Sequence, residues 1–236
     1  MMEQRNPPDF IIEAFADPNS VRDVVRALLH TIFFLRYFPT LSPTTREFLG
    51  THVPYVSDDQ IVTLIDQRAT ALARQLDTER HQHPRNNSSY NSGGRGQMTV
   101  QFLEKRRKKT WLPIRAGDDE IPWESWTIKV TVSEPRTEGE RTKVRKATES
   151  TLASSVMKTL TMGNTHKDHI PPITNSDANP FTYQIHVGGV PRSLQHNQQQ
   201  NSQQQNQPQA QQQQQQKEPT SLASAAGGWA SRMGIY

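Results

Sequence analysis

The stretch GQMTVQFLEKRRKKTWLPIRAGDDEIPWESWTIKVTV, residues 96–132, decides the fold of this chain. Apolar residues alternate with polar ones near both of its ends, at Met98, Val100 and Phe102 and again at Trp126, Ile128, Val130 and Val132. An alternation with a period of two indicates strands that bury one face. Residues 98–132 are therefore predicted to form a β-hairpin with a protruding tip.

The predicted tip carries a run of five cations: Lys105, Arg106, Arg107, Lys108 and Lys109. Such a basic patch can face phosphates, anionic lipid or an acidic partner, or serve as a nuclear-import signal. It can equally be the solvated end of a strand that resists edge aggregation. Three acids, Asp118, Asp119 and Glu120, lie in the same loop, and local charge balance is their simplest interpretation.

Trp111 lies beyond the cations and is followed by Leu112, Pro113 and Ile114. Charged and turn-forming residues on both sides leave this tryptophan poorly placed to reach a core. An exposed tryptophan brings a large apolar area with few rotamers to freeze on binding, so we expect it to contact a partner. Trp123 and Trp126, by contrast, flank a predicted strand start and are expected in the core.

Three segments outside the hairpin have apolar residues at helical spacing. The expected N-terminal caps are Ser20 with Asp23, Ser57 with Gln60, and Thr137 with Glu140, and the expected ends are Pro39, His81 and Gly163-Asn164. The apolar stripe of the third helix is thin, because many of its members are Thr or Ser. This helix is therefore expected on a sheet surface or at a subunit interface.

The remaining segments are predicted to contain short strands and loops. Strands are expected over residues 10–16 and 181–187, a loop over 83–96, and short strands or a meandering connection over 40–56. Strands and helices thus alternate irregularly, and one sheet can cover the helices on one face. This pattern predicts an α+β domain.

Composition separates a domain from a tail. The chain has 236 residues with 33% hydrophobic content and a mean hydropathy of −0.80, but 18 of the 22 residues over 195–216 are Gln or Asn. Such a segment cannot bury enough apolar surface to offset its chain entropy. We expect one domain over 1–192 and a disordered tail over 193–236. The apolar end, Trp229 to Tyr236, is expected to be a docking segment, a membrane-surface foot or disordered.

Several classes of protein are disfavoured. The chain has no cysteine, which excludes a disulfide framework and thiol catalysis and favours the cytosol or nucleus. We expect neither secretion nor a membrane span, because the start lacks a signal peptide and the longest apolar run, residues 27–35, is interrupted. The net charge of +4 is modest and owes much to the basic run.

No catalytic or cofactor-binding signature is found in the sequence. His30 lies among apolar helix positions, so a hydrogen-bonded structural histidine is favoured over a catalytic base. His166 and His169 with Asp168, and His81 with His83, are weak candidates for a metal site, because neither pair has further ligands at a recognisable spacing. We therefore expect no enzyme activity, no cofactor, no metal and no small-molecule substrate.

Four motifs in order resemble the autophagy-related protein 101 family: ALLHTIFFLR (27–36), GQMTVQFLEKRRKKTW (96–111), IPWESWTIKV (121–130) and HKDHIPPI (166–173). The glutamine tract suggests a fungal-type member. The resemblance implies a HORMA fold, in which a mainly antiparallel, twisted sheet packs against three helices. It implies a non-catalytic adaptor of autophagy initiation that works in the cytoplasm, at the phagophore assembly site, with at most peripheral membrane contact.

The family's known partners give further expectations. The resemblance implies pairing with, and stabilisation of, the HORMA domain of autophagy-related protein 13 in the initiating kinase complex. It also implies a tryptophan finger that recruits downstream factors, with Trp111 as its first aromatic residue. The second aromatic residue of the family is replaced here by Leu112-Pro113-Ile114. Motifs alone do not give the residues of the HORMA–HORMA interface, and the thin stripe of the third helix is the first place to look.

A rival hypothesis is a nuclear protein that binds nucleic acid or chromatin. In that case residues 105–109 contact phosphates, Trp111 stacks on bases and the Gln-rich tail joins a transcriptional assembly. Steep salt dependence of binding distinguishes this class of protein from an adaptor.

Overall fold

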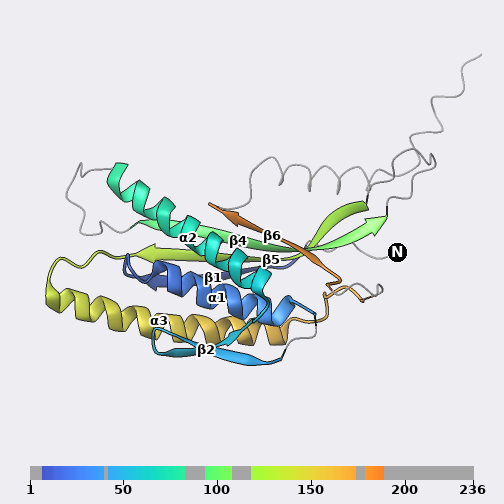
Figure 1. Cartoon of the computed structure of the whole chain (residues 1–236), viewed down its shortest axis with the longest axis horizontal. Coiled ribbons are helices and arrows are strands. Elements are labelled where there is room, and N and C mark those ends of the chain that lie inside the picture. Colours follow the sequence, from blue (N-terminus) through green and yellow to red (C-terminus); the bar gives the residue numbers. More distant parts are fainter. Residues whose placement is uncertain (1–6, 40–41, 83–93, 108–117, 174–178, 189–236) are drawn as a thin grey trace, which may run out of the picture. The chain divides into compact units, whose positions relative to one another are not determined.

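The computed structural model describes residues 7–39, 42–82, 94–107, 118–173 and 179–188. The elements are β1 (Asp9–Ala16), α1 (Val21–Arg36), β2 (Thr44–Phe48), β3 (Thr51–Tyr55), α2 (Asp59–Gln82), β4 (Arg95–Arg107), β5 (Asp118–Val132), α3 (Glu138–Thr165) and β6 (Thr182–Val187) (Figure 1). The predicted α+β class is confirmed. Residues 108–117, which include the predicted finger residues 111–114, lie outside the described residues, as do most of the predicted loop and the tail from 189.

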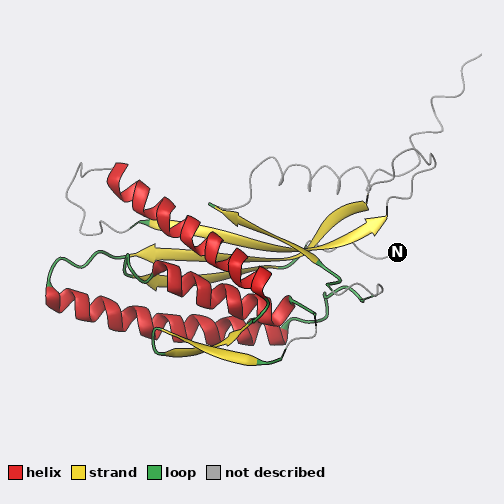
Figure 2. Ribbon diagram, in the orientation of Figure 1, coloured by secondary structure: helices red, strands yellow, loops and turns green. Residues whose placement is uncertain are grey.

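Four strands form the main sheet in the order β1-β5-β4-β6. The pairs β5–β4 and β4–β6 are antiparallel, and β1 runs parallel to β5. The register places Trp126 of β5 between Phe10 of β1 and Val100 of β4, so the alternating apolar residues of three strands share one face. All three helices contact the sheet, as expected for sheet-on-helix packing (Figure 2).

An aspartate in the turn before α1 engages the expected cap residue Ser20, and an aspartate caps α2 in place of Ser57. Asp17 Oδ1 accepts from the backbone N of Asn19 (2.9 Å) and of Ser20 (3.1 Å), and the Ser20 hydroxyl donates to Asp17 Oδ2 at 2.5 Å. Ser20 is therefore the N-cap residue, as predicted, but its side chain makes no cap hydrogen bond, because the preceding turn already engages it.

The second helix begins one residue later than expected. Asp58 Oδ1 accepts from the backbone N of Gln60 (2.9 Å) and of Ile61 (3.1 Å). Asp58 rather than Ser57 thus satisfies two free amides of the first turn, since a carboxylate is a stronger acceptor there than a hydroxyl. The third prediction is confirmed, because Thr137 and Glu140 form a reciprocal capping box at the start of α3.

Helix α3 does not end at Gly163, as expected, but continues to Thr165. The glycine serves a different purpose, because a Cβ built at this position would lie 2.6 Å from Cδ1 of Leu35 on α1. Gly163 therefore allows α1 and α3 to approach closely instead of ending the helix.

Residues 40–56 were expected to form short strands or a meandering connection. They contain a hairpin of β2 and β3. Its two turn residues, Leu49 and Gly50, have φ of 48° and 75°, values that match a two-residue turn with both central residues in the left-handed region. The hairpin makes its own two-stranded sheet and packs on α1 and α3.

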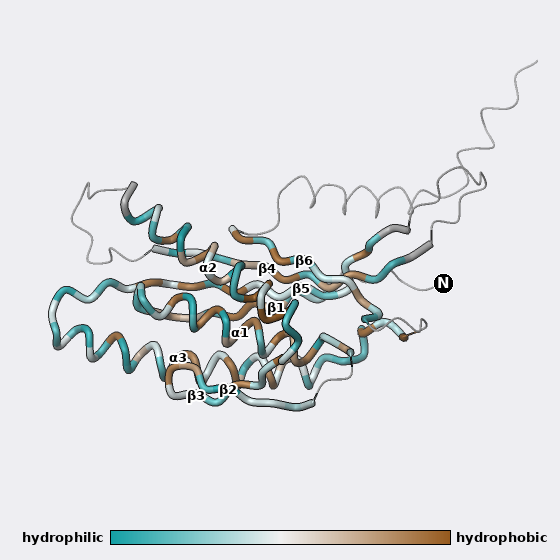
Figure 3. Tube along the Cα trace, viewed as in Figure 1, coloured by the Kyte–Doolittle hydropathy of each residue, from teal (hydrophilic) through white to brown (hydrophobic). Residues whose placement is uncertain are grey.

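The core lies between the main sheet and the helices, where hydrophobic segments of the strands meet those of α1 (Figure 3). The N-terminal half of α3 is largely hydrophilic in the same view. Its thin stripe packs within the chain, with Leu152 fully buried and Thr148 and Ser155 nearly so. This helix was expected on a sheet surface or at a subunit interface, and the position on a sheet surface is therefore confirmed.

Helix α3 also covers the outer edge of β1. Ser155 Oγ donates to the Glu13 carbonyl at 2.7 Å, and Lys158 Nζ donates to the Ile11 carbonyl at 3.2 Å. These bonds occupy carbonyl groups that an added strand would need. Among the described helices, none combines the length and the apolar character that a bilayer crossing requires.

Candidate interaction site

The strands β4 and β5 extend beyond their neighbours. Pairing of β1 with β5 begins at Asp9 with Ser125, and pairing of β6 with β4 ends at Thr182 with Leu103. Residues 104–107 and 118–121 therefore form a two-stranded ribbon, which leaves the sheet at the right of Figure 1. The described ribbon leads into residues 108–117, where the expected finger residues Trp111, Leu112, Pro113 and Ile114 lie.

The backbone register of this ribbon sets three basic positions of β4 against three acidic positions of β5. Lys105 pairs with Glu120, Arg106 with Asp119 and Arg107 with Asp118. The remaining cations of the basic patch, Lys108 and Lys109, lie outside the described residues. The basic patch over residues 105–109 and its interpretation as local charge balance therefore stay predictions.

The base of the ribbon is anchored to the sheet. Glu120 accepts hydrogen bonds from Thr182 Oγ1 (3.1 Å) and Gln184 Nε2 (3.4 Å) of β6. Trp123 is 7% exposed and packs its ring 5.1 Å from that of Phe181. Trp126 is fully buried, so the expectation of core positions for both tryptophans is confirmed.

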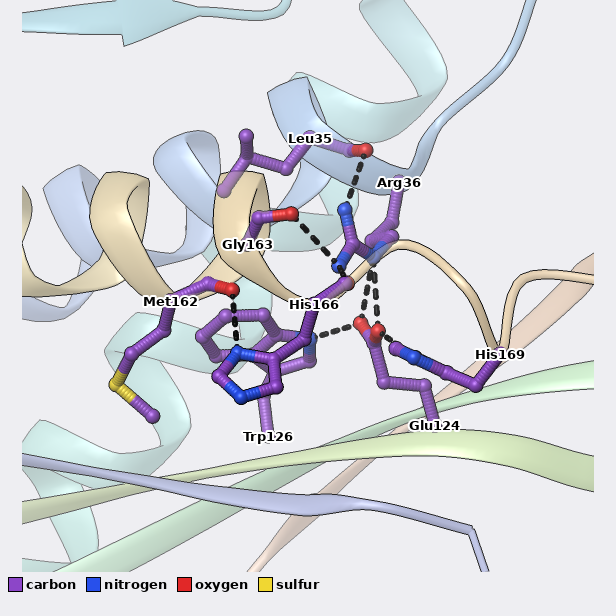
Figure 4. A network of polar contacts seen from close by, with 8 residues as sticks. All are labelled: Leu35, Arg36, Glu124, Trp126, Met162, Gly163, His166 and His169. Carbon is purple, nitrogen blue, oxygen red and sulfur yellow. Dashed lines mark hydrogen bonds and ion pairs between the residues drawn. The ribbon is translucent and has the colours of Figure 1, made fainter.

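A buried polar network lies behind this base (Figure 4). Glu124 of β5 is fully buried, and its two oxygens accept from Nε of Arg36 at 2.8 and 2.9 Å. Trp126 Nε1 donates to the same carboxylate, and His169 Nε2 lies 2.6 Å from it. A buried carboxylate needs such compensation, because desolvation of an unpaired charge is very costly.

Arg36 connects this network to the end of α3. Its Nη2 donates to the carbonyls of Gly163 (3.2 Å) and His166 (3.0 Å). A guanidinium at a helix C-terminus satisfies free carbonyls and complements the helix dipole. One side chain therefore fixes α1, β5 and α3 relative to one another.

The sequence argument did not single out Arg36 and Glu124, although a signal was present. Glu124 shares its parity along the strand with Trp126 and Ile128, so it points toward the core face. A carboxylate at a core-facing position requires a buried cation, and Arg36 ends the most apolar helix of the chain.

The candidate metal ligands have other roles in the structure. His169 contacts Glu124, and Nδ1 of His166 lies 3.1 Å from the Met162 carbonyl. Within the described part of the chain, no three His, Asp or Glu side chains are placed to hold a metal ion. His83, a member of the other candidate pair, lies outside the described residues.

His30 is fully buried, as expected of a structural histidine. Its ring stacks on Tyr55 of β3 at 4.1 Å between ring centroids. The expected hydrogen bond is not found, because neither ring nitrogen has a partner among the described residues. Burial, with the nearby cations Arg26 and Arg46, lowers the pKa of His30 to about 3, so the ring is neutral near neutral pH.

Two large apolar side chains remain exposed on neighbouring helices. Phe34 of α1 is 38% exposed and Met157 of α3 is 62% exposed. The two helices pack on each other, and both contact β3. Exposed apolar residues on adjacent elements are candidates for partner contact.

A shallow groove of about 690 Å³ lies between the β1–α1 turn and α3. Its charged side chains are largely paired with one another, for example Arg80 with Glu134 (2.7 Å) and Arg145 with Glu149 (3.1 Å). Such pairing leaves little unsatisfied charge for a small ligand.

The family model and the relatives that match this chain carry the same name. The family model described as autophagy-related protein 101 matches residues 13–177, more than half of the chain. A relative of that name in Schizosaccharomyces pombe is 26% identical over 163 residues, 69% of this chain and 77% of the relative. A relative in Xenopus tropicalis is 26% identical over 199 residues, 74% of this chain and 85% of the relative.

The relative in Homo sapiens is 32% identical over a shorter stretch of 109 residues, 40% of this chain and 48% of the relative. The matched residues 13–177 include the ribbon strands, the Arg36–Glu124 pair and His169. The chain therefore belongs to the autophagy-related protein 101 family.

Proposed function

We propose that this chain is a non-catalytic adaptor of autophagy initiation with a HORMA domain over residues 1–192. Family membership is the observation that carries this proposal. The α+β architecture with three helices against one sheet agrees with it. The candidate histidines contribute to packing and to the buried network, which also fits an adaptor better than an enzyme.

The adaptor pairs with the HORMA domain of autophagy-related protein 13 and stabilises it within the initiating kinase complex. The thin stripe of α3 is used inside the chain, so the pairing surface is assigned to other residues. Phe34 and Met157 are suitable, because they are exposed, apolar and on adjacent helices. Burying them on a partner would remove apolar area from water.

Light scattering after size-exclusion chromatography tests this pairing. The full chain mixed with the partner HORMA domain is expected to elute as a one-to-one complex. Phe34→Ala/Met157→Ala should weaken that complex at least tenfold. Ile11→Ala provides a matched control, because Ile11 is similarly apolar and 40% exposed but lies on β1. Two separate monomers with the unaltered chain would overturn the pairing.

Residues 111–114 act as the finger that recruits downstream factors. The ribbon supports this role, because residues 104–107 and 118–121 extend beyond the pairs that β1 and β6 make and lead into this segment (Figure 1). Trp111→Ala should abolish capture of downstream factors and leave the HORMA–HORMA complex intact. Loss of both together would indicate misfolding, and loss of neither would remove the finger from the proposal.

We propose that the adaptor acts in the cytoplasm and at the phagophore assembly site. The rival function in nucleic-acid binding receives less support, because the family model and the named relatives favour an autophagy role. Measurable binding to nucleic acid near physiological salt, with a steep decrease at higher salt, would reverse this preference.

A further inference from the structure

The hairpin of β2 and β3, residues 44–55, forms a two-stranded sheet of its own and packs on α1 and α3. Figure 3 shows it beside α3, apart from the main sheet. Each strand has five residues, and only Phe48 of β2 and Val53 of β3 are buried. A two-stranded hairpin is marginal by itself in water. This hairpin therefore depends on the helices beneath it for its stability.

Apolar packing and ring contacts attach the hairpin to these helices. The side-chain hydrogen bonds of the hairpin stay within it: Thr44 Oγ1 donates to the Tyr55 carbonyl (2.9 Å), and Arg46 Nη1 donates to the Tyr55 hydroxyl (3.2 Å). Among the described residues, no hydrogen bond or ion pair joins residues 44–55 to α1 or α3. The hairpin can thus separate from the two helices without leaving a broken hydrogen bond on either of them.

His30 of α1 lies under the hairpin and makes its docking less favourable. The ring is fully buried and stacks on Tyr55 at 4.1 Å between ring centroids. Neither ring nitrogen has a hydrogen-bond partner among the described residues. Burying a polar ring without such a partner costs free energy, which is regained when water reaches the ring. Lifting of the hairpin is therefore offset in part by hydration of His30.

The chain after β3 is anchored. Val56 is fully buried, and Asp58 caps α2 by accepting from the backbone N of Gln60 and Ile61. The Tyr37 hydroxyl donates to the other oxygen of Asp58 at 3.0 Å. A movement of the hairpin can therefore end at Val56 and leave α2 in place.

We propose that residues 44–55 form a flap that lifts from α1 and α3 as one unit while the main sheet stays folded, and that His30 beneath it favours the lifted state. Lifting costs less free energy than global unfolding, because it gives up only the few buried contacts of the hairpin. Once lifted, the two strands lose the support of the helices, so their amides become open to solvent exchange.

The flap borders the residues that the proposed pairing uses. Phe34 lies four residues after His30, on the same face of α1. Strand β3 contacts both α1 and α3, the helix that carries Met157. A partner on Phe34 and Met157 is therefore expected to hold the flap closed, and a closed flap should tighten pairing in return, because such coupling is reciprocal. This consequence rests on the proposed pairing, whereas lifting of the flap does not.

Hydrogen exchange of the full chain, without any partner, tests the flap. Amides of β2 and β3 report on the flap, and those of Val100 and Ile128 report on the main sheet. Protection of the flap amides should be at least about a hundredfold lower than that of the main-sheet amides. Low concentrations of urea should hardly change flap exchange and should speed main-sheet exchange steeply, because a local opening exposes little surface. An equally steep response of both sets would overturn the proposal.

Two buried valines provide matched variants. Val53 on the flap is 0% exposed, and Val130 on β5 is 1% exposed. Val53→Ala should speed exchange of the flap amides by about tenfold, because it weakens the packing that lifting breaks. Val130→Ala should change flap exchange by less than about twofold, because the main sheet stays folded when the flap lifts. Equal acceleration of flap exchange by both variants would mean that the flap opens only with the whole domain.

His30→Phe tests the role of the buried histidine. It keeps a ring against Tyr55 and removes the two ring nitrogens. Flap exchange should slow by about fivefold, since no unpaired polar group is then covered. Unchanged or faster exchange in this variant would overturn the part assigned to His30.

The same measurement with the partner HORMA domain tests the coupling. The partner should slow flap exchange in the unaltered chain, and Phe34→Ala/Met157→Ala should lose that effect. If the flap behaves as expected without the partner but no complex forms, the pairing fails and the flap stands. If a complex forms but flap exchange responds to urea as steeply as the main sheet does, the flap fails and the pairing stands.

Discussion

His30 shows how a single buried residue makes stability depend on pH. Its pKa is lowered from 6.5 to about 3, so between these values the unfolded chain binds one more proton than the folded chain. Stability contributed at this site is therefore fully present above pH 6.5 and is lost as pH falls toward 3, at about 1.4 kcal/mol per pH unit. His30→Phe keeps a ring against Tyr55 and removes the titration.

Urea unfolding at pH 7.5 and pH 5.0 checks this prediction. The decrease in unfolding free energy between the two pH values should be about 2 kcal/mol smaller in His30→Phe than in the unaltered chain. His52→Gln, which replaces an exposed histidine on β3, is measured as the control substitution. Equal pH dependence in His30→Phe and the unaltered chain would contradict the argument.

The Arg36–Glu124 pair is a second residue-scale test. Removing either partner leaves the other charge buried, so Arg36→Met and Glu124→Gln should each destabilise the chain by about 3–5 kcal/mol. Arg36→Met/Glu124→Gln should cost clearly less than the sum, because neither charge remains. Chemical denaturation measures all three. Additive effects would show that the two residues act independently.

At the scale of elements, the two glycines of α3 have different surroundings. A Cβ at Gly139 would meet nothing within 4 Å, whereas a Cβ at Gly163 would lie 2.6 Å from Leu35. Gly139→Ala should therefore stabilise the chain by up to about 1 kcal/mol through helix propensity. Gly163→Ala should be less stable than Gly139→Ala by at least about 1 kcal/mol, because the close approach of α1 and α3 is disturbed.

Thermal and urea unfolding of both variants give the comparison. Adding Leu35→Ala should reduce the loss of stability caused by Gly163→Ala. It should not alter the effect of Gly139→Ala, since only Gly163 lies close to Leu35. Equal stability of the two glycine variants would mean that the helices separate without cost.

At the scale of the whole molecule, pairing with a second HORMA domain should appear as increased stability. A partner that binds only the folded chain raises its unfolding free energy by about 2.7 kcal/mol at a concentration 100 times the Kd. Thermal unfolding at rising partner concentration measures this. Phe34→Ala/Met157→Ala should lose the increase and Ile11→Ala should keep it. A melting temperature independent of partner concentration would count against the pairing.

The elements with strong local patterns were predictable from the amino-acid sequence alone. Alternation over residues 98–102 and 126–132 predicted two strands, and Thr137 with Glu140 predicted the start of α3, because side-chain periodicity and capping depend on neighbours along the chain. The same reasoning placed Trp123 and Trp126 in the core. Ordered motifs gave the family resemblance, which the comparison confirmed.

Contacts between residues that are far apart in the sequence became evident only in the folded structure. Arg36 and Glu124 are 88 positions apart, and Leu35 and Gly163 lie on different helices, so no local pattern shows that either pair is in contact. Asp58 replaced Ser57 as the cap of α2, and the Ser20 side chain bonded to Asp17 instead of the first turn of α1, because turn geometry decided which groups came within reach. The residue pairs of the ribbon likewise depend on the register of β4 with β5. Strand register is fixed by packing against the rest of the sheet, and sequence spacing across a ten-residue connection does not determine it.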